Sequence, residues 1–404
     1  MKNITIIGRG VSGNAAERLA KNAGFNCAVV TDTDCQQLPE CDLIVVSPGV
    51  PPLTSRLYRQ AVDSGVPMVS EIEFAYGYCK YPLLAVTGTN GKTTTTELTC
   101  HLLKNLGVRA EVAGNIGRPL ADLVIDEPDL DVAVVEVSNF QLELTGSFAP
   151  LGAVLLNLAS DHIDRYAGGF AEYCQVKERV FDNVIAENRI YGLSFSDSVR
   201  RVRYQDGRLF CGGIEVIDLA ETDLPGFPNA ENAAAALELV LCFMPDAVDK
   251  FAEKLAAGFK SFRRDAHRIE FVGQKQGITF INDSKGTNPA AVEAAIGAVR
   301  SEKIVIMLGG LAKGMDFSCL RNYLPRFRKV VLFGRDRAEI AGQMQLSADA
   351  AVDCGSDFNA AFACAVKSAC AGDTVLLSPG CASMDMFENY KERGNVFRQM
   401  VNEL

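Results

Sequence analysis

The sequence predicts an α/β fold in three domains, each built around a mostly parallel sheet. One pattern recurs along the chain: a short β-branched apolar run, a turn rich in glycine or polar residues, and then a stretch with helical spacing. Buried parallel strands have apolar sequences of this kind because helices cover both of their faces. The chain has 404 residues, and at about 100 to 200 residues a domain this length predicts more than one domain. The expected strands are residues 4–7, 27–30, 43–46, 83–86, 132–137, 153–156, 278–281, 304–308, 330–333 and 374–377.

Two segments separate successive series of strands. Residues 75–82 (AYGYCKYP) precede a second glycine-rich start, and residues 258–265 (GFKSFRRD) precede a further series of strands. Within the region between them, residues 190–225 hold two adjacent glycines and an alternating stretch, which indicate a small hairpin. The expected domains are residues 1–80, 81–265 and 266–404.

Composition and charge restrict the class of protein. Lys and Arg number 40 against 50 Asp and Glu, so the formal net charge of -10 disfavours a general surface for nucleic acid. The 13 cysteines include no C-x-x-C spacing, which disfavours a disulfide framework and a thiolate zinc site. No apolar run reaches about 18 residues, and the start MKNITIIGRG shows no signal-peptide pattern. We therefore expect a cytoplasmic protein without a membrane span, and we expect it to be a monomer.

The first glycine-rich loop follows the run at residues 4–7. Residues 8–13 (GRGVSG) fit G-x-G-x-x-G, and they precede a helical stretch at 14–22 and a strand that ends near Asp32. The glycines permit a tight turn and a close approach of the backbone, while the helix N-terminus offers unpaired N–H groups to a diphosphate. A nicotinamide cofactor is the usual ligand of this Rossmann-like arrangement. Any nucleotide diphosphate satisfies the same physics, and a purely structural turn is the remaining interpretation.

The second glycine-rich loop, residues 87–93 (TGTNGKT), lies between the run at 83–86 and a helical segment that continues through Leu106. Its backbone N–H groups could surround the phosphates of a nucleoside triphosphate. Lys92 could reach the outer phosphates, and Thr93 could supply a magnesium ligand. The full P-loop pattern would place glycine at position 86, where this chain has Val86. The loop nevertheless predicts ATP binding and a central domain of the P-loop ATPase type.

Acidic and imidazole side chains are expected at the same sheet edge as the second loop. Glu136 ends a buried run, and residues 153–156 lead into the segment 161–166 (DHIDRY) with His162. In open parallel sheets, ligands sit beyond the carboxyl ends of the strands. Magnesium prefers oxygen ligands, so Glu136, Thr93 and phosphate oxygens could share it. The alternatives are a solvated charge for Glu136, a turn residue for His162, and an exposed surface charge instead of a phosphate contact for Arg268.

Several segments taken together resemble the Mur ligases, the ATP-dependent amide-forming enzymes of peptidoglycan precursor synthesis. They span nearly the whole chain in family order, and the forms DHxDRY and SxFQL point to the branch that adds D-glutamate to UDP-N-acetylmuramoyl-L-alanine. The matching segments are residues 87–93, 114–117 (GNIG), 136–142 (EVSNFQL) and 161–166, Lys177, and residues 281–287 (INDSKGT), 333–336 (FGRD) and 377–385 (LSPGCASMD).

The resemblance implies roles for particular residues. It assigns the first glycine loop to the UDP diphosphate of the sugar substrate, with Gly10, Val11, Ser12, Asp32, Thr33, Ser47, Pro48 and Gly49 nearby, and it places Asn115 and His162 near the muramoyl-peptide end. The ATP contacts that it implies are Gly88, Thr89, Asn90, Gly91, Lys92, Thr93, Thr94, Asn232, Arg268 and Asp283. The implied D-glutamate contacts are Thr287, Lys313, Ser383 and Tyr390.

The resemblance also implies the metal set and the catalytic group. Two magnesium ions are expected beside Thr93, Glu136, His162 and Lys177, and the catalytic residues are expected to be Lys92, Asp161, His162 and Lys177. In this family the lysine at the position of Lys177 is carbamylated, which converts an ammonium into a carboxylate-like ligand. An unmodified lysine in an ion pair is the ordinary alternative.

The implied reaction is formation of an acyl phosphate followed by attack of the D-glutamate amine. Three departures from the family pattern concern the adenine side and the D-glutamate pocket: Pro228, Ala312 and Tyr390. A nicotinamide-dependent oxidoreductase and a nucleotide switch are alternatives from other classes, but each leaves part of the motif set unused. Folylpolyglutamate synthase is the nearest competitor among ligases.

Overall fold

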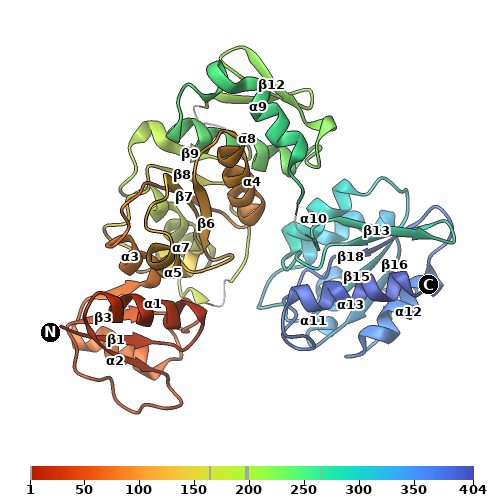
Figure 1. The fold of residues 1–404 in the computed structure, drawn as a ribbon. Helices are drawn as coiled ribbons and strands as arrows, with labels where there is room; N and C mark the ends of the chain where they lie inside the picture. The colour runs from red at the N-terminus through yellow and green to blue at the C-terminus, as the bar shows by residue number, and fades with distance from the viewer. Residues whose placement is uncertain (1, 163–164, 196–199, 265) are drawn as a thin grey trace. The chain divides into compact units, whose positions relative to one another are not determined.

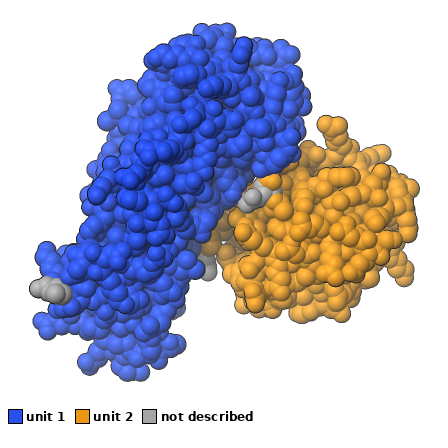
Figure 2. Space-filling view, viewed as in Figure 1, with its two compact units in different colours: residues 1–158, 165–263 blue, residues 159–164, 264–404 orange. Residues whose placement is uncertain are grey.

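The computed structural model describes residues 2–162, 165–195, 200–264 and 266–404. The chain divides into two compact units, which Figure 2 colours separately. The first unit comprises residues 1–158 and 165–263, and the second comprises residues 159–164 and 264–404. The expected boundary near 80 falls inside the first unit, and residue 265 of the other boundary lies outside the described residues; both boundaries stay predictions.

The first sheet of the first unit is parallel, with strand order β2-β1-β3-β4. The order reverses at β1, which has β2 on one side and β3 on the other, so the loops after β1 and β3 lie at a topological switch point. The strands are β1 (Asn3–Ile7), β2 (Asn26–Val30), β3 (Leu43–Val46) and β4 (Met68–Ser70), and the helices are α1 (Val11–Asn22), α2 (Arg56–Ser64) and α3 (Glu71–Tyr76).

Helix α1 begins at Val11, earlier than the predicted stretch that starts at residue 14. The reason is Gly13, which lies inside the first turn of the helix. A Cβ at Gly13 would lie 2.0 Å from the carbonyl oxygen of Gly8, so only glycine lets the helix start this close to β1. The glycine pattern therefore belongs to the helix as well as to the loop.

The central sheet of the first unit is also parallel, with order β6-β7-β5-β8-β9 (Figure 1). Strand β5 lies between β7 and β8, so the second glycine loop leaves the sheet at its switch point. The strands are β5 (Leu83–Thr87), β6 (Ala110–Gly114), β7 (Val132–Glu136), β8 (Gly152–Leu155) and β9 (Arg189–Tyr191). The helices are α4 (Lys92–Asn105), α5 (Leu120–Asp126), α6 (Asn139–Leu142), α7 (Gly169–Glu178), α8 (Asn229–Phe243) and α9 (Ala247–Ser261).

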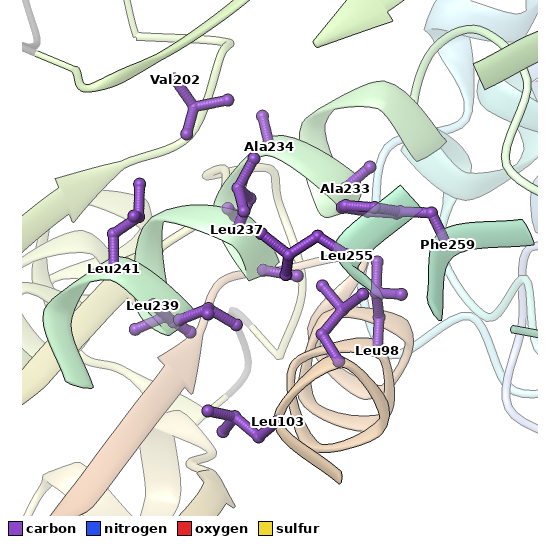
Figure 3. Close-up of a cluster of buried hydrophobic side chains, with 14 of the residues drawn as sticks. Leu98, Leu103, Val202, Ala233, Ala234, Leu237, Leu239, Leu241, Leu255 and Phe259 are labelled. Carbon is purple, nitrogen blue, oxygen red and sulfur yellow. The ribbon is translucent and has the colours of Figure 1, made fainter. Parts of the chain in front are cut away.

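The largest buried cluster holds α4, α8 and α9 together. Figure 3 shows Leu98 of α4, Leu237 of α8, and Phe259 of α9 meeting within it. Each of these three side chains is 0% exposed. Apolar burial of this kind stabilises by about 25 cal/mol for each Å² removed from water. The cluster therefore anchors the helix that begins at Lys92.

The predicted hairpin region forms a small antiparallel sheet of three strands, β10 (Val202–Gln205), β11 (Arg208–Cys211) and β12 (Ile214–Asp218). Short 3-10 helices in the first unit cover Arg179–Phe181, Ala186–Asn188 and Leu219–Glu221.

The second unit contains one six-stranded sheet, with order β13-β14-β18-β15-β16-β17. Only the pair β13 and β14 is antiparallel within this sheet as described. The strands are β13 (Glu270–Lys275), β14 (Ile278–Asn282), β15 (Ile304–Gly309), β16 (Phe327–Phe333), β17 (Ala351–Asp353) and β18 (Thr374–Leu377). The helices are α10 (Pro289–Ala298), a 3-10 helix at Ser318–Arg326, α11 (Arg337–Met344), α12 (Phe358–Ser368) and α13 (Tyr390–Asn402).

The predicted α/β class with mostly parallel sheets is confirmed. All 13 cysteines are free thiols in the structure, and Cys370 is the exposed one. Among the described residues, no helix combines the length and the apolar character that a membrane crossing needs.

Candidate active site

The second glycine loop connects the buried strand β5 to α4. Gly91 precedes the helix with φ of 84°, and a Cβ there would lie 2.1 Å from Oδ1 of Asn232. Asn232 in turn accepts a hydrogen bond from the hydroxyl of Thr95 over 3.3 Å. The amide N–H of Asn90 donates to Oδ1 of Asn157 over 2.9 Å. The loop is thus fixed by residues that follow β8 and begin α8, and the predicted Asn232 does lie against it.

Two lysines converge on the loop. Lys92 Nζ donates to the carbonyls of Gly88 and Thr89 at 2.8 Å each. Lys177 Nζ, on α7, donates to the same Gly88 carbonyl at 2.9 Å, although the Lys177 side chain is only 1% exposed. The Lys177 ammonium also lies 4.8 Å from the centre of the Tyr173 ring. Both ammoniums are therefore held beside backbone that a triphosphate would approach.

A carboxylate and a hydroxyl meet at the start of α4. Thr93 Oγ1 donates to Oε2 of Glu136 over 2.7 Å, and Asn115 Nδ2 donates to Oε1 of the same carboxylate over 2.7 Å. Glu136 ends β7 and is 2% exposed, so it is a buried acid rather than a solvated charge. Oxygen donors so close together suit a hard cation such as magnesium. Thr93, Glu136 and Asn115, three of the predicted site residues, are thus brought together in the first unit.

Tyr173 was not predicted as part of the site. Its hydroxyl lies 2.9 Å from Oγ1 of Thr89, and the hydroxyl of Thr89 is buried in the loop. The sequence does place this aromatic residue one helical turn before Lys177, but residues of a hydrophobic core have the same spacing.

The remaining predicted residues of the ATP loop are Gly88 and Thr94. Gly88 has φ of 143° and supplies the carbonyl that both lysines contact. Thr94 is a buried residue in the first turn of α4.

The first glycine loop and the turn after β3 lie together. Ser47 Oγ donates to the carbonyl of Gly8 over 3.2 Å, while a Cβ at Gly10 would meet nothing within 4 Å. Asp32 Oδ1 accepts from the backbone of Leu57, the second residue of α2. A hydrogen bond from Ser55 is the largest cause that lowers the pKa of Asp32. Of the other predicted residues here, Val11, Thr33 and Gly49 are exposed, and Ser12 and Pro48 are partly buried.

Asp161 and His162 belong to the second unit. Nε2 of His162 lies 3.7 Å from Oδ1 of Asp161, and Asn288 Nδ2 donates to the other oxygen of that carboxylate at 3.3 Å. His162 has φ of 53°, in the left-handed region. Ile163 and Asp164 of the same segment lie outside the described residues. The predicted metal set is therefore divided, with His162 in one unit and the other three residues in the other.

Asp283 follows β14 and is buried. Burial raises its pKa to about 7, although a hydrogen bond from Ser378 Oγ at 2.7 Å opposes that shift. The backbone N–H of Ile269 donates to its other oxygen at 3.3 Å. Arg268 lies near enough for its charge to favour the ionised form as well. Two predicted ATP contacts of the second unit are thus neighbours.

The residues predicted for D-glutamate lie after three adjacent strands of the second unit, β14, β15 and β18. Thr287 and Lys313 are partly buried, and Lys313 has φ of 52°. The Oγ of Ser383 is buried without a hydrogen-bond partner. Tyr390 begins α13, and its hydroxyl accepts a hydrogen bond from Lys285 Nζ over 3.0 Å.

Arg393 is a second residue that sequence reasoning did not select. Its side chain is 0% exposed and donates to the carbonyls of Ser284 and Cys381, at 2.8 and 3.1 Å. It thereby links the loop after β14 to the loop after β18. A single arginine on an amphipathic helix carries no such signal in the sequence, because arginines are usually exposed.

Comparisons with known proteins support the motifs. Residues 86–205 match the family model of the Mur ligase middle domain, and residues 267–381 match that of the Mur ligase, glutamate ligase domain. The chain is 38% identical to the UDP-N-acetylmuramoylalanine–D-glutamate ligase of Syntrophus aciditrophicus, over 92% of this chain and 86% of that protein. It is 36% identical to the ligase of the same name from Pelotomaculum thermopropionicum, over 100% of this chain and 98% of that protein.

Solved structures share the fold. The UDP-N-acetylmuramate-alanine ligase MurC of Thermotoga maritima superposes with a TM-score of 0.60 at 16% identity, covering 100% of both chains. The MurF ligase of Thermotoga maritima, determined in complex with ADP, gives a TM-score of 0.58 at 16% identity, over 99% of this chain and 95% of that one. These likenesses confirm the predicted three-domain α/β architecture.

Proposed function

Because this chain belongs to the Mur ligase family, we propose that it joins D-glutamate to UDP-N-acetylmuramoyl-L-alanine and converts ATP to ADP and phosphate. The observation that carries the proposal is the identity of 36 to 38% with ligases of that name across most or all of the chain. The glycine loop before α4, with Lys92, Thr93 and the neighbouring Glu136, supports the use of ATP.

The reaction requires activation because a bare carboxylate is a poor electrophile. The terminal carboxylate of the UDP-sugar-alanine attacks the γ-phosphorus of ATP, so that a carbon-bound oxygen forms the new bond to phosphorus and ADP leaves. The amine of D-glutamate then attacks the acyl phosphate carbonyl. The amine gives up a proton, phosphate leaves from the tetrahedral intermediate, and the amide remains. Alignment and charge neutralisation supply most of the catalysis in phosphoryl transfer.

Lys92 is proposed to neutralise the outer phosphates, since its ammonium lies over the loop carbonyls of Gly88 and Thr89. Thr93 and Glu136 are proposed to hold magnesium, whose chemistry when bound is to neutralise phosphate charge. The 2.7 Å contact between their oxygens fits a hard cation that needs few protein ligands. His162 and Asp161 are also proposed as catalytic residues.

Lys177 is proposed to be carbamylated. Addition of CO2 to the neutral amine forms a carbon-nitrogen bond and releases one proton, which turns the side chain into an oxygen donor. The position of Lys177 supports this proposal, because a side chain that is 1% exposed lies beside the Gly88 carbonyl and the Tyr173 ring.

The other substrates are assigned to loops at the switch points of the sheets. UDP is assigned to the loop after β1 and the turn after β3, with Asn115 toward the muramoyl-peptide end. D-glutamate is assigned to Thr287, Lys313, Ser383 and Tyr390, whose donors suit its two carboxylates. The buried Oγ of Ser383, which lacks a partner in the structure, supports this assignment. We further propose that the protein acts in the cytoplasm as a monomer.

Phosphate release in the presence of ATP and UDP-N-acetylmuramoyl-L-alanine tests the function. D-glutamate is expected to stimulate release, while L-glutamate, L-alanine and meso-diaminopimelate are expected to have little effect. If D-glutamate gives no stimulation, the substrate assignment is wrong. Release that no amino acid alters would instead indicate a simple nucleotidase.

A further inference from the structure

Arg165 makes contacts with two different parts of the first unit. Its Nε and Nη2 donate to the two carboxylate oxygens of Glu143, over 2.7 and 2.6 Å. Its Nη1 donates to the carbonyl of Val50 over 3.0 Å. The guanidinium carbon lies 4.2 Å from the centre of the Phe140 ring. A single planar group thus joins the segment after α6, on the central sheet, to the turn after β3, on the first sheet.

The ion pair between Arg165 and Glu143 is buried, which restricts its geometry. The side chains of Arg165 and Glu143 are only 12% and 13% exposed. The hydroxyl of Tyr166 donates to the same Glu143 carboxylate over 2.7 Å, and Asn139 Nδ2 donates to that hydroxyl over 2.6 Å. Bidentate arginine-carboxylate pairs fix orientation as well as distance, and lysine cannot reproduce their fork.

The segment that holds Glu143 is itself attached to the first sheet at a second place. The carbonyl of Leu144 accepts from the backbone of Ser70 over 3.0 Å, and the carboxylate of Glu73 accepts from the backbone of Ser147 over 2.7 Å. These bonds reach the end of β4 and the helix α3. Of these attachments, the Arg165 contact reaches the turn after β3, where the UDP head group is proposed to bind.

The turn that Arg165 contacts is compact. The backbone N–H of Val50 donates to the carbonyl of Ser47 over 3.0 Å, and Ser47 packs against Gly8 of the first glycine loop. Ser47 and Val50 are 6% and 8% exposed. A hydrogen bond to the Val50 carbonyl can therefore fix the position of the whole turn.

We propose that Arg165 is a positioning residue for the UDP substrate, which holds the turn after β3 in register with the central sheet through the Val50 carbonyl. The proposal rests on the assignment of UDP to that turn. Substrate alignment is sensitive to displacements of about 1 Å, so a loosened turn weakens UDP binding before it affects the nucleotide loop on β5.

The test compares Arg165→Lys with the wild-type protein. Lysine keeps one charged contact with Glu143 but cannot also reach the Val50 carbonyl. We expect the KM for UDP-N-acetylmuramoyl-L-alanine and the Kd for UDP alone to rise about 10-fold, equivalent to about 1.4 kcal/mol. The KM values for ATP and D-glutamate are expected to stay within about 2-fold, since the described contacts of Arg165 are with Glu143, Val50 and Phe140, none of which is assigned to either ligand.

Arg109→Lys is the matched control, because Arg109 makes a bidentate pair with Asp131 that is exposed on the surface. It is expected to leave all three KM values unchanged. Glu143→Gln is a second variant, which keeps one acceptor for Arg165, and it is expected to raise the UDP constants by a smaller factor. A merely structural role would lower the thermal midpoint without selectively changing the UDP constants.

Equal changes in all three KM values, or unchanged UDP constants in folded Arg165→Lys protein, would overturn the proposal. So would a wild-type protein that does not bind UDP. Binding of UDP requires no turnover, so this comparison remains decisive even if the wild-type protein fails to release phosphate with D-glutamate, a result that would reject the proposed function instead.

Discussion

The hydroxyl of Thr93 and the carboxylate of Glu136 lie 2.7 Å apart, although 43 residues separate them in the chain. The second oxygen of Glu136 accepts a hydrogen bond from Asn115 over 2.7 Å. Both oxygens of this buried acid are therefore oriented by polar partners from α4 and from the loop after β6. Because these oxygens are already held in place, binding of a cation requires little further ordering of the side chain.

Thr93→Val is expected to lower kcat about 100-fold and to raise the magnesium concentration needed for half-maximal activity, because valine has the same shape but no oxygen donor. Phosphate release measured across a magnesium titration checks this. Thr99→Val is the control on the same helix, since Thr99 Oγ1 donates to the backbone carbonyl of Thr95, one turn earlier in α4. Equal activity of Thr93→Val and wild type would remove Thr93 from the metal site.

Lys177→Ala is expected to reduce turnover about 100-fold or more, because alanine removes the proposed carbamate ligand. Protein equilibrated with 13C-bicarbonate should give a carbamate NMR signal that Lys177→Ala lacks. Lys104→Ala is the comparison, since Lys104 is an exposed lysine paired with Glu111. Undiminished turnover of Lys177→Ala would refute the carbamate.

Glu71→Gln is expected to change how stability depends on pH. Glu71 is 0% exposed, and burial raises its pKa from 4.5 to about 7, even though the backbone of Ala121 donates to it. The folded protein therefore binds a proton that the unfolded chain releases between those two values, so wild-type stability falls as pH rises through this window. The variant should lack this fall and be more stable above about pH 7, by up to about 3 kcal/mol. Unfolding in urea at several pH values measures the difference.

Glu73 lies two residues further along α3. Replacing it by glutamine is expected to change the pH dependence of stability in the opposite direction. Burial alone would raise its pKa, but hydrogen bonds from the segment 146–148, including the side chain and backbone of Ser147, outweigh burial and lower it. Glu73→Gln is therefore expected to destabilise at neutral pH and to match wild type once the carboxyl is protonated. If stability changed with pH in the same way in Glu71→Gln and Glu73→Gln, the pKa values of the two carboxyls would not be shifted in opposite directions.

Leu237→Ala is expected to destabilise the first unit by about 2 to 5 kcal/mol, because it leaves a cavity where α8 packs in the largest buried cluster. Leu53→Ala should change stability by less than about 0.5 kcal/mol, since Leu53 is 55% exposed. Thermal and urea unfolding check both. A similar loss in both variants would contradict the assignment of the cluster as the core behind α4.

The sequence predicted the central strands well and the edge strands poorly. Strand β15 (IVIMLG) is apolar throughout and strand β7 (VAVVE) is apolar up to its last residue, because both strands are covered on both faces. Strands β6 (AEVAG) and β13 (EFVGQK) contain glycine and charged residues, and they were not foreseen. Both lie at sheet edges, where one side of the strand lacks a neighbour and polar residues are tolerated.

The candidate site follows the same division. Lys92, Thr93 and Glu136 could be predicted because each adjoins a strong strand pattern, and parallel strands bring their carboxyl ends to one edge. Arg165 could not be assigned its partners, since Glu143 and Val50 are 22 and 115 residues away in the chain. Contacts between distant loops depend on how the two sheets of the first unit pack, which no local pattern encodes.

The exposure of Cys370 offers a practical way to attach a probe to the native protein. Every other cysteine is at least partly buried, and the second unit carries Cys370 just before β18. A maleimide dye added in limiting amount should react there first, because a buried thiol is both less accessible and less readily ionised. Single-molecule fluorescence could then follow the second unit during turnover without removing any of the other thiols.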